Sequence, residues 1–373
     1  MVKEIAIYSG HALDNAYSCI LYLKNALEKD CSVVLWSNSQ KNNFGDNSYL
    51  FENTWYYKIP KIRFLLKNIH VFFNMVFHDS FVIINDLDFF IVAYYAKKIK
   101  KSLKVIHYNT EIHGVDVKYF SFIEKFYEKH ANFPDLIIDC LEERATYRKN
   151  KFNIDKEIYV INNTCSKEYI DSVINENFDK SNFSLVGDRK VLIYSGSCEY
   201  GVDLDKLVNI ISSLGDKVYF LCYCYGKEES FNALCNKCKS TLQEGTYQIN
   251  KSIDRSLLLN ILYHVGDIGI VYYDPSKSIN YKYASPSKFF EYMACGLNIL
   301  STNNEGINRI ISSNNLGKCF INENDIYDSL QYILNEKLML KKDIINLFNT
   351  KYCYENDSIE CINAIKRLIE NNN

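Results

Sequence analysis

Short apolar runs alternate with longer segments of helical periodicity along most of the chain. In the first half, Glu4–Ser9, Phe81–Asn85 and Lys104–Tyr108 have the composition of buried strands, and the segments between them place apolar residues at helical spacing. Strands that alternate with helices in this way are typical of a parallel sheet with both faces covered. We predict further strands of this half at 32–36, 136–140 and 158–161.

The alternation stops between residues 166 and 188, where Asn, Asp and Ser replace the apolar period, and it resumes at Lys190–Tyr194. We therefore predict an α/β protein with two Rossmann-like domains of parallel sheet, at 1–170 and 189–353, joined by a linker at 171–188. The final segment, 354–373, has a helical pattern, and whether it packs back on the first domain stays open. Ligands of such sheets bind beyond the carboxyl ends of the strands, so we expect the site in a cleft between the facing domains.

Composition narrows the class of protein. The 373 residues carry a net charge of −2, which argues against a protein that coats nucleic acid. The 13 cysteines are odd in number, and Met1 runs almost directly into a predicted strand without a secretory leader, so we expect reduced thiols and a cytoplasmic protein. Cys235 and Cys238 have metal-ligand spacing, but no second pair follows. We expect no metal and no cofactor.

The most informative stretch lies between Asp267 and Gly306. Its central helix is predicted to begin with Ser285 as cap and Pro286 in the first turn, and to end at Gly296. The first turn of that helix, which contains Ser287, offers N–H groups and a positive dipole to a diphosphate.

Two charged residues share one face of this helix. Lys288 adds a full positive charge to the first turn, and Glu291 follows three residues later. A carboxylate accepts hydrogen bonds from both hydroxyls of a ribose, so the pair suits a nucleoside diphosphate. The plain alternative is an ion pair between Lys288 and Glu291 within the helix.

The order of these features resembles the nucleotide-sugar signature of the retaining glycosyltransferases of family 4, which have the GT-B fold. That signature runs from an Asp-Ile-Gly strand through Pro-x-Lys-x-x-Glu-Tyr-Met-x-x-Gly to a strand and a Gly-containing loop, as in 267–306 here. The resemblance implies two Rossmann-like domains and a donor ribose held by Glu291. The chain departs from the family at Tyr283, where an earlier glutamate often stands.

Weaker matches cover most of the chain. The run 85–88 and the strand that ends near Thr110 and Glu111 resemble the first domain of the family, although Thr110 replaces a histidine. The turn at 194–203 resembles the start of the second domain, but Ser197 and Tyr200 stand where the family has cations for the donor diphosphate. Either Lys288, the helix N-terminus and Lys227 replace those cations, or the donor carries less charge, or activity is lost; we favour the first.

Candidate residues at the strand ends complete the predicted site. For donor binding they are Gly10, Gly196, Ser197, Tyr247, Ser285, Ser287, Lys288 and Glu291. For catalysis they are Glu111, which we rank first because it ends a strand in a motif region, and His11, Asp14 and His113. Each of the four taken alone is more typical of a polar loop than of a catalyst.

Two patches bear on location. One is the lysine run between Lys97 and Lys104, and the other is Lys61–Phe77, which combines many apolar residues with Lys61, Arg63 and Lys67. They indicate either a solvated helix end and a buried core helix, or contact with the anionic inner face of the plasma membrane, where a lipid-linked acceptor is presented.

These features predict an enzyme that transfers a sugar from a nucleoside diphosphate donor, a UDP-sugar, to a glycan or lipid-linked acceptor in surface polysaccharide or glycolipid synthesis. The resemblance implies retention of stereochemistry, and we expect a mechanism that needs no metal. Two alternatives stay open: a nucleotide-sugar epimerase of the same architecture, and a degenerate homologue that binds a glycan or a partner transferase. No nucleic-acid partner is expected.

Overall fold

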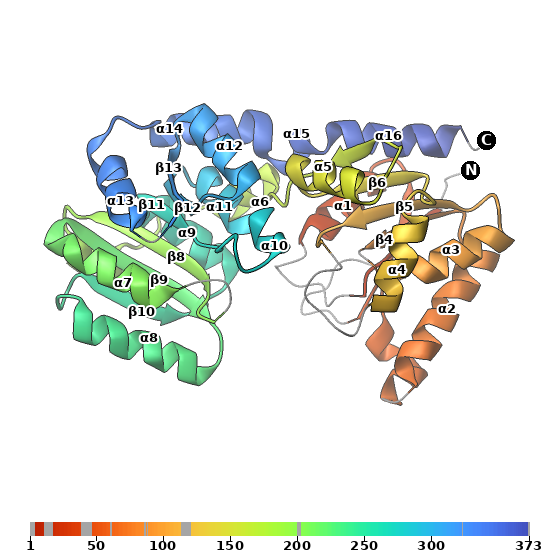
Figure 1. The fold of residues 1–373 in the computed structure, drawn as a ribbon, viewed down its shortest axis with the longest axis horizontal. Coiled ribbons are helices and arrows are strands. Elements are labelled where there is room, and N and C mark those ends of the chain that lie inside the picture. The colour runs from red at the N-terminus through yellow and green to blue at the C-terminus, as the bar shows by residue number, and fades with distance from the viewer. Residues whose placement is uncertain are drawn as a thin grey trace. The chain divides into compact units, whose positions relative to one another are not determined.

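The chain forms two α/β units, each built on one parallel sheet (Figure 1). The structure is a computed structural model and describes residues 4–10, 18–38, 47–59, 62–85, 87, 89–112, 121–199, 203–322 and 324–371. The first unit contains Met1–Asn163 and Asp357–Asn373, and the second contains Thr164–Asn356. The prediction of two α/β halves with parallel sheets is confirmed.

The first unit has a seven-stranded sheet in the order β3-β2-β1-β4-β5-β6-β7. Its strands are β1 (Glu4–Tyr8), β2 (Ser32–Ser37), β3 (Ser48–Leu50), β4 (Phe81–Asn85), β5 (Lys104–Asn109), β6 (Leu136–Asp139) and β7 (Ile158–Val160). Its helices are α1 (Ser18–Glu28), α2 (Arg63–Phe77), α3 (Phe90–Ile99), α4 (Ser121–His130), α5 (Glu142–Lys151) and α16 (Ile359–Glu370), with short 3₁₀ turns η2 (Phe51–Asn53) and η3 (Trp55–Lys58).

The second unit has a six-stranded sheet in the order β10-β9-β8-β11-β12-β13. Its strands are β8 (Lys190–Ser197), β9 (Val218–Tyr225), β10 (Tyr247–Lys251), β11 (Ile268–Val271), β12 (Asn298–Thr302) and β13 (Gly317–Phe320). Its larger helices are α6 (Lys167–Val173), α7 (Leu204–Ser213), α8 (Glu228–Thr241), α9 (Arg255–Val265), α11 (Ser287–Ala294), α12 (Glu305–Asn314), α13 (Asp325–Asn335) and α14 (Lys341–Leu347). Its shorter helical segments are η4 (Ser181–Val186), η5 (Gly215–Lys217), α10 (Ile279–Lys282), η6 (Phe348–Tyr352) and α15 (Tyr354–Asp357).

The two sheets repeat one topology, since in each the chain builds outward from a central strand to one side and then to the other. This order places a switch point between β1 and β4 in the first unit and between β8 and β11 in the second. Ligands of open parallel sheets bind at the carboxyl ends of the strands beside such points. The topology therefore marks the loops after β8 and β11 as a site in the second unit.

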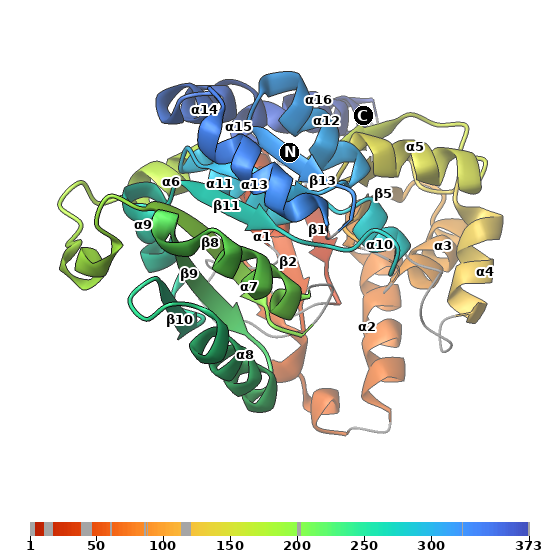
Figure 2. The ribbon, with the colours of Figure 1, turned by 60° about the vertical axis from the view of Figure 1, so that its left-hand side comes forward.

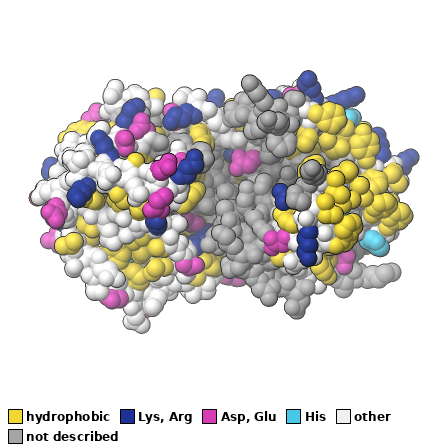
Figure 3. All heavy atoms as spheres, turned by 90° about the horizontal axis from the view of Figure 1, so that it is seen from below, with side chains coloured by type: hydrophobic (Ala, Val, Ile, Leu, Met, Phe, Trp, Pro, Cys, Tyr) yellow, Lys and Arg dark blue, Asp and Glu magenta, His cyan; other side chains and the backbone are white. Residues whose placement is uncertain are grey.

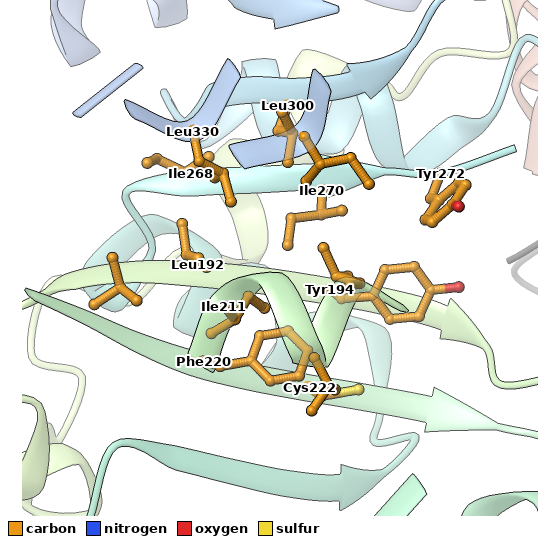
Figure 4. Packing of buried hydrophobic residues seen from close by; sticks show 14 of the residues in the cluster. Leu192, Tyr194, Ile211, Phe220, Cys222, Ile268, Ile270, Tyr272, Leu300 and Leu330 are labelled. Atoms are coloured by element: carbon orange, nitrogen blue, oxygen red, sulfur yellow. The ribbon is translucent and has the colours of Figure 1, made fainter. Parts of the chain in front are cut away.

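One face of the second sheet is covered by α7, α8 and α13, whose buried residues form a common core with β8, β9 and β11 (Figures 1 and 2). Leu192, Ile268 and Ile270 lie at the centre of this core (Figure 4). Tyr194 and Tyr272 lie toward one end of it, and their rings end in hydroxyl groups that point away from the aliphatic side chains (Figure 4). The core is thus bordered by polar groups near the strand ends that belong to the switch point.

The predicted linker at 171–188 belongs to the second unit, whose boundary lies at 163/164 instead of 170/171. Polar contacts hold this segment to α9: the side chain of Asn260 accepts from Asn175 N at 2.7 Å and donates to the carbonyl of Val173 at 2.7 Å. Because these contacts use backbone and amide groups, the segment needs no periodic apolar residues, and its sequence therefore resembled a linker.

The last helix, α16, packs against β7 of the first unit. Lys366 Nζ on this helix lies 2.6 Å from a carboxylate oxygen of Asp30. Just before the helix, Asp357 accepts from the backbone and side-chain N–H groups of Asn162 at 2.6 and 2.7 Å. The C-terminal segment therefore packs on the first unit.

Helix α11 lies on the other face of the second sheet, against β11 and β12. The ring of Tyr292 on this helix fills the space beside Gly269 of β11, and a Cβ placed on that glycine would lie 2.2 Å from the ring. The neighbouring Asp267 accepts from Val191 N at 2.9 Å and thereby joins the start of β11 to β8. The Asp-Ile-Gly sequence is thus explained by strand pairing at its first residue and by helix packing at its third.

We predict that Gly269→Ala lowers the free energy of unfolding by about 1 to 3 kcal/mol, because the added methyl group overpacks the contact with Tyr292. Urea unfolding measures the change. Combining the substitution with Tyr292→Leu should recover part of the loss. Strictly additive effects of the two substitutions would contradict a direct contact.

Candidate functional site

Helix α11 is fixed to the sheet by a polar contact as well as by packing. The hydroxyl of Tyr292 accepts from Ser195 N at 3.1 Å and lies 3.0 Å from Ser195 Oγ, near the end of β8. Both residues are buried. The contact fixes the first two turns of α11 beside the switch point, so that residues on this face of the helix meet the end of β8.

Lys288 is one of these residues and is almost completely buried. Its Nζ lies 4.7 Å from the ring centroid of Tyr194 and 5.2 Å from that of Tyr273, so two aromatic faces stabilise the ammonium group. Burial lowers the pKa of Lys288 to about 8, although the nearby carboxylate of Glu291 acts in the opposite direction. A buried amine of this kind is a point charge that an incoming anion can use.

The ammonium group of Lys288 can lie beside the end of β8 because residue 196 is a glycine. A Cβ at Gly196 would lie 2.3 Å from Lys288 Nζ, and the φ angle of +154° is rarely adopted by other residues. The sequence placed both residues in the predicted site, and the structure brings them together.

Glu291 is buried and pairs with Arg255, not with Lys288. The distance between Arg255 Nη2 and Glu291 Oε1 is 2.7 Å, and each side chain is 9% exposed. Arg255 Cζ also lies 5.3 Å from the ring centroid of Tyr169. The ion pair therefore links α11 to the start of α9. Glu291 makes this contact instead of the ion pair with Lys288 that was the alternative within the helix.

Arg255 is the residue that sequence reasoning missed. It begins α9 directly after Asp254, which caps that helix by accepting from Ser256 N at 2.8 Å. A cation shortly after a strand could have indicated a site residue, because the connections that follow the strands lie at the carboxyl ends of a parallel sheet. Its pairing with Glu291, 36 positions away in the chain, has no local pattern.

The turn after β8 carries a carboxylate close to where the family resemblance implies cations. Ser197 Oγ accepts from Glu199 N at 3.0 Å, and Glu199 Oε1 accepts from Lys227 N at 2.9 Å and from Ser230 Oγ at 3.0 Å. These hydrogen bonds lower the pKa of Glu199, so it is ionised at neutral pH. Lys227 thus enters the turn through its backbone. Tyr200 lies outside the described residues.

The start of α11 differs from the predicted cap. The helix begins at Ser287 and Pro286 holds the cap position, so the predicted cap at Ser285 lies one residue too early. Ser285 is nevertheless buried beside the helix start. The first N–H groups of an α-helix have no carbonyl partner within it, and a proline side chain cannot supply one.

Tyr247 lies away from this group. It is the first residue of β10, and it packs against the core of α7, α8 and α13. In a parallel sheet the first residue of a strand is at the edge opposite to the strand ends, so Tyr247 does not lie with Gly196 and Lys288.

Polar residues also gather at the strand ends of the first unit. Ser9 Oγ donates to Asn85 Oδ1 at 3.2 Å, and the carbonyl of Gly10 accepts from the side chain of Asn38. Asn85 Nδ2 lies 3.3 Å from Thr110 Oγ1, so the position that replaces a family histidine is part of this group. These polar groups thus lie beside the switch point of the first unit.

Glu111 is exposed and follows β5, while its backbone carbonyl accepts from Arg148 Nη2 at 3.0 Å. Arg148 is fully buried and lies 2.7 Å from Asp139 Oδ2. This buried pair fixes the backbone of Glu111 but leaves its side chain at the surface. His11, Asp14 and His113 lie outside the described residues.

All thirteen cysteines are free thiols, and most are buried. Cys235 and Cys238 lie on α8, where Cys238 is part of the core. Among residues that the structure describes, no group of three or more His, Cys, Asp or Glu side chains could hold a metal ion.

No protein-family model and no curated protein matches the sequence. Solved structures match the fold over almost the whole chain. A glycosyltransferase from Rickettsia africae matches with a TM-score of 0.75, 13% identity and 99% coverage of both chains. A trehalose-6-phosphate protein of E. coli bound with UDP-2-fluoro glucose matches at 0.69 and 10% identity, covering 97% of this chain and 98% of that one.

A UDP-N-acetylglucosamine 2-epimerase from Listeria monocytogenes has a TM-score of 0.66 and 11% identity, with 100% of this chain and 98% of that chain covered. At these identities the likeness establishes the architecture, which is that of the GT-B glycosyltransferases. The GT-B prediction is therefore confirmed for the fold, whereas membership of family 4 is not.

We predict that Arg255→Met lowers the free energy of unfolding by about 3 to 5 kcal/mol, because it leaves the buried Glu291 carboxylate without its cation. Adding Glu291→Gln should recover a large part of this loss, since the remaining amide carries no charge. A double-mutant cycle in urea measures the coupling. A coupling free energy of zero would show that the ion pair does not stabilise the fold.

Proposed function

We propose that this protein is a glycosyltransferase that binds a nucleoside diphosphate sugar on its second unit. The observation that carries the proposal is the arrangement on α11, where buried Lys288 lies beside Gly196 at the end of β8 and buried Glu291 lies one helical turn further on. This arrangement lies beside the switch point of the sheet, where parallel α/β proteins bind ligands.

In this proposal Glu291 accepts hydrogen bonds from the ribose hydroxyls. Its Oε1 pairs with Arg255, and a carboxylate has further acceptor sites on its other oxygen. Arg255 compensates the negative charge of Glu291, which otherwise repels an incoming diphosphate. The ion pair thus fixes the position of the carboxylate and reduces its repulsion of a neighbouring phosphate group.

Lys288 and the first N–H groups of α11 bind the diphosphate and stabilise the charge that develops on it as the leaving group departs. In the turn near residue 197, the carboxylate of Glu199 accepts hydrogen bonds from two uncharged donors, Lys227 N and Ser230 Oγ. Lys288 thus supplies positive charge that the turn lacks, while Arg255 neutralises Glu291 and Lys227 contributes its backbone N–H to Glu199.

The finer assignment of substrates extends this proposal. UDP-sugars are the proposed donors, because two proteins of the same fold are described with UDP or with a UDP-sugar in their names. We propose a glycan or lipid-linked acceptor bound by the first unit and transfer with retention and without a metal. Among the described residues, Glu111 and the polar residues around Asn85 are our candidates for contact with the acceptor.

A nucleotide-sugar epimerase is the second candidate, because one of the matching folds is named as such. Incubation with a UDP-sugar alone separates the two. Conversion to an epimeric UDP-sugar without an acceptor would favour the epimerase, whereas release of UDP that increases with an acceptor glycan would favour the transferase. Lack of binding to every nucleoside diphosphate would contradict both.

We predict that Glu291→Ala weakens UDP binding about 100-fold, equivalent to about 3 kcal/mol, because two charge-assisted hydrogen bonds to the ribose are lost. Isothermal titration calorimetry measures the affinity, and circular dichroism at the same temperature confirms the fold. Glu336→Ala, at an exposed carboxylate after α13, is the matched control. Unchanged UDP affinity in Glu291→Ala would show that the nucleotide binds elsewhere.

We predict that UDP affinity falls about tenfold for each pH unit above about 8. Because the pKa of Lys288 is lowered, the free protein loses the ammonium charge in this range, and binding of a diphosphate must then recover a proton. Lys288→Arg should have a flat profile, since arginine stays charged. A pH dependence that persists in Lys288→Met would assign the titration to another group.

A further inference from the structure

Helix α2 of the first unit has two apolar faces, of which only one is buried. Lys67, Val71 and Met75 face the core, where the Lys67 ammonium lies among aromatic rings. The opposite stripe repeats every fourth residue and is exposed: Leu65 is 58% exposed, Ile69 41%, Phe73 50% and Phe77 67%. The predicted alternative of a buried core helix is therefore wrong for half of the helix circumference.

The exposed stripe extends onto neighbouring elements. At the first end of α2, Ile62 and Phe64 are exposed, and so is Trp55 of the adjoining turn η3. Helix α3 packs beside α2 and also exposes apolar residues, but its Tyr95 packs against Phe126 of α4. Seen from below, hydrophobic side chains gather on the right of the molecule, where α2 lies in Figure 1 (Figure 3). We call this surface the α2 surface; it consists of Trp55, Ile62, Phe64, Leu65, Ile69, Phe73 and Phe77.

The charged side chains of the segment that carries η3 and α2 are positive. Between Thr54 and His78 the sequence contains no Asp or Glu, whereas Lys58 and Arg63 are exposed. At the end of α3, Lys98 and Lys101 are exposed as well. The other lysines of that run have internal partners, since Lys97 pairs with Asp135 and Lys100 donates to the carbonyl of Asp79. The expected lysine patch is therefore smaller than the sequence indicated. Lys98 lies over the ring of Tyr94, which packs against His130 of α4, so the cations beside the exposed stripe are Lys58 and Arg63.

This combination identifies the chemistry of the partner. Exposure of four large apolar side chains in one row to water is unfavourable, so we expect a partner to cover the α2 surface. Its cationic border calls for a negatively charged partner. A second copy of the chain, related by a twofold axis, would bring like-charged borders together. An anionic bilayer complements both features, since its acyl region accepts the stripe and its headgroups accept the cations.

We propose that the α2 surface docks this protein on an anionic lipid membrane, with α2 lying in the plane of the interface. Leu65, Ile69, Phe73 and Phe77 enter the boundary between headgroups and acyl chains, and Trp55 lies at headgroup level. The attachment is peripheral: within the described part of the chain, no helix is both long and apolar enough to cross a bilayer. The inference does not depend on the proposed transfer activity.

The test is sedimentation of the full chain with vesicles of phosphatidylcholine, with or without phosphatidylglycerol. We expect binding to the mixed vesicles and little binding to phosphatidylcholine alone. Phe73→Gln with Phe77→Gln should lower the partition coefficient at least about tenfold, because two anchors are removed. Lys58→Glu with Arg63→Glu should lower it and reduce its dependence on salt.

Matched controls come from the second unit. Leu185→Gln with Ile321→Gln replaces apolar residues that are 64% and 76% exposed, and Lys217→Glu with Lys239→Glu reverses two exposed charges. Both control variants should bind the mixed vesicles like the unaltered chain. All of the substituted residues of the α2 surface are exposed, and circular dichroism checks that each variant folds.

Several results would overturn the proposal. They are a chain that stays in the supernatant with mixed vesicles, equal binding to phosphatidylcholine alone, or unchanged binding in the Phe73→Gln, Phe77→Gln variant. A dimer in light scattering that this variant converts to a monomer, without vesicle binding, would assign the α2 surface to self-association. UDP binding measured in parallel keeps a failure of this proposal separate from a failure of the proposed function.

Discussion

The contact of Tyr292 with Gly269 and Ser195 determines the geometry of the second unit's site. The ring occupies the space that a side chain on β11 would fill, and the hydroxyl bonds to β8. One residue of α11 is thereby fixed to both strands that flank the switch point. Since a helix is rigid over two turns, Lys288 and Glu291 are placed by the same contact. The site is positioned by packing, and its charges follow from that position.

Burial of these charges is possible because each has a specific partner. Aromatic faces surround the ammonium group of Lys288, and Arg255 neutralises Glu291. The first unit uses the same device where Arg148 pairs with Asp139 and holds the backbone of the loop after β5. In both units a buried cation fixes a loop or helix at the strand ends. The cost of removing charge from water is offset only where such partners are in place.

Regular alternation predicted the two sheets, because a buried parallel strand must be apolar on both faces. Elements with a weaker signal were missed: β3, β10 and β13 are short and half-buried, and the segment before β8 is held to α9 by amide hydrogen bonds. Local spacing likewise located Lys288 and Glu291 on one helix. It did not reveal Arg255. It also assigned Tyr247 to the donor site, although Tyr247 begins β10 and the candidate site lies at the opposite, carboxyl ends of the strands.

The sequence by itself determined the class of fold and the helix that carries the candidate site. Both follow from the periodicity of apolar residues and from the residues at helix ends, which are local properties. Only the tertiary structure decided which charge neutralises Glu291 and which face of α2 meets solvent. Helix α2 is apolar around most of its circumference, so its period could not separate a core helix from a docking surface. That choice depends on what packs against each face, and packing partners are brought together by the fold from distant parts of the chain.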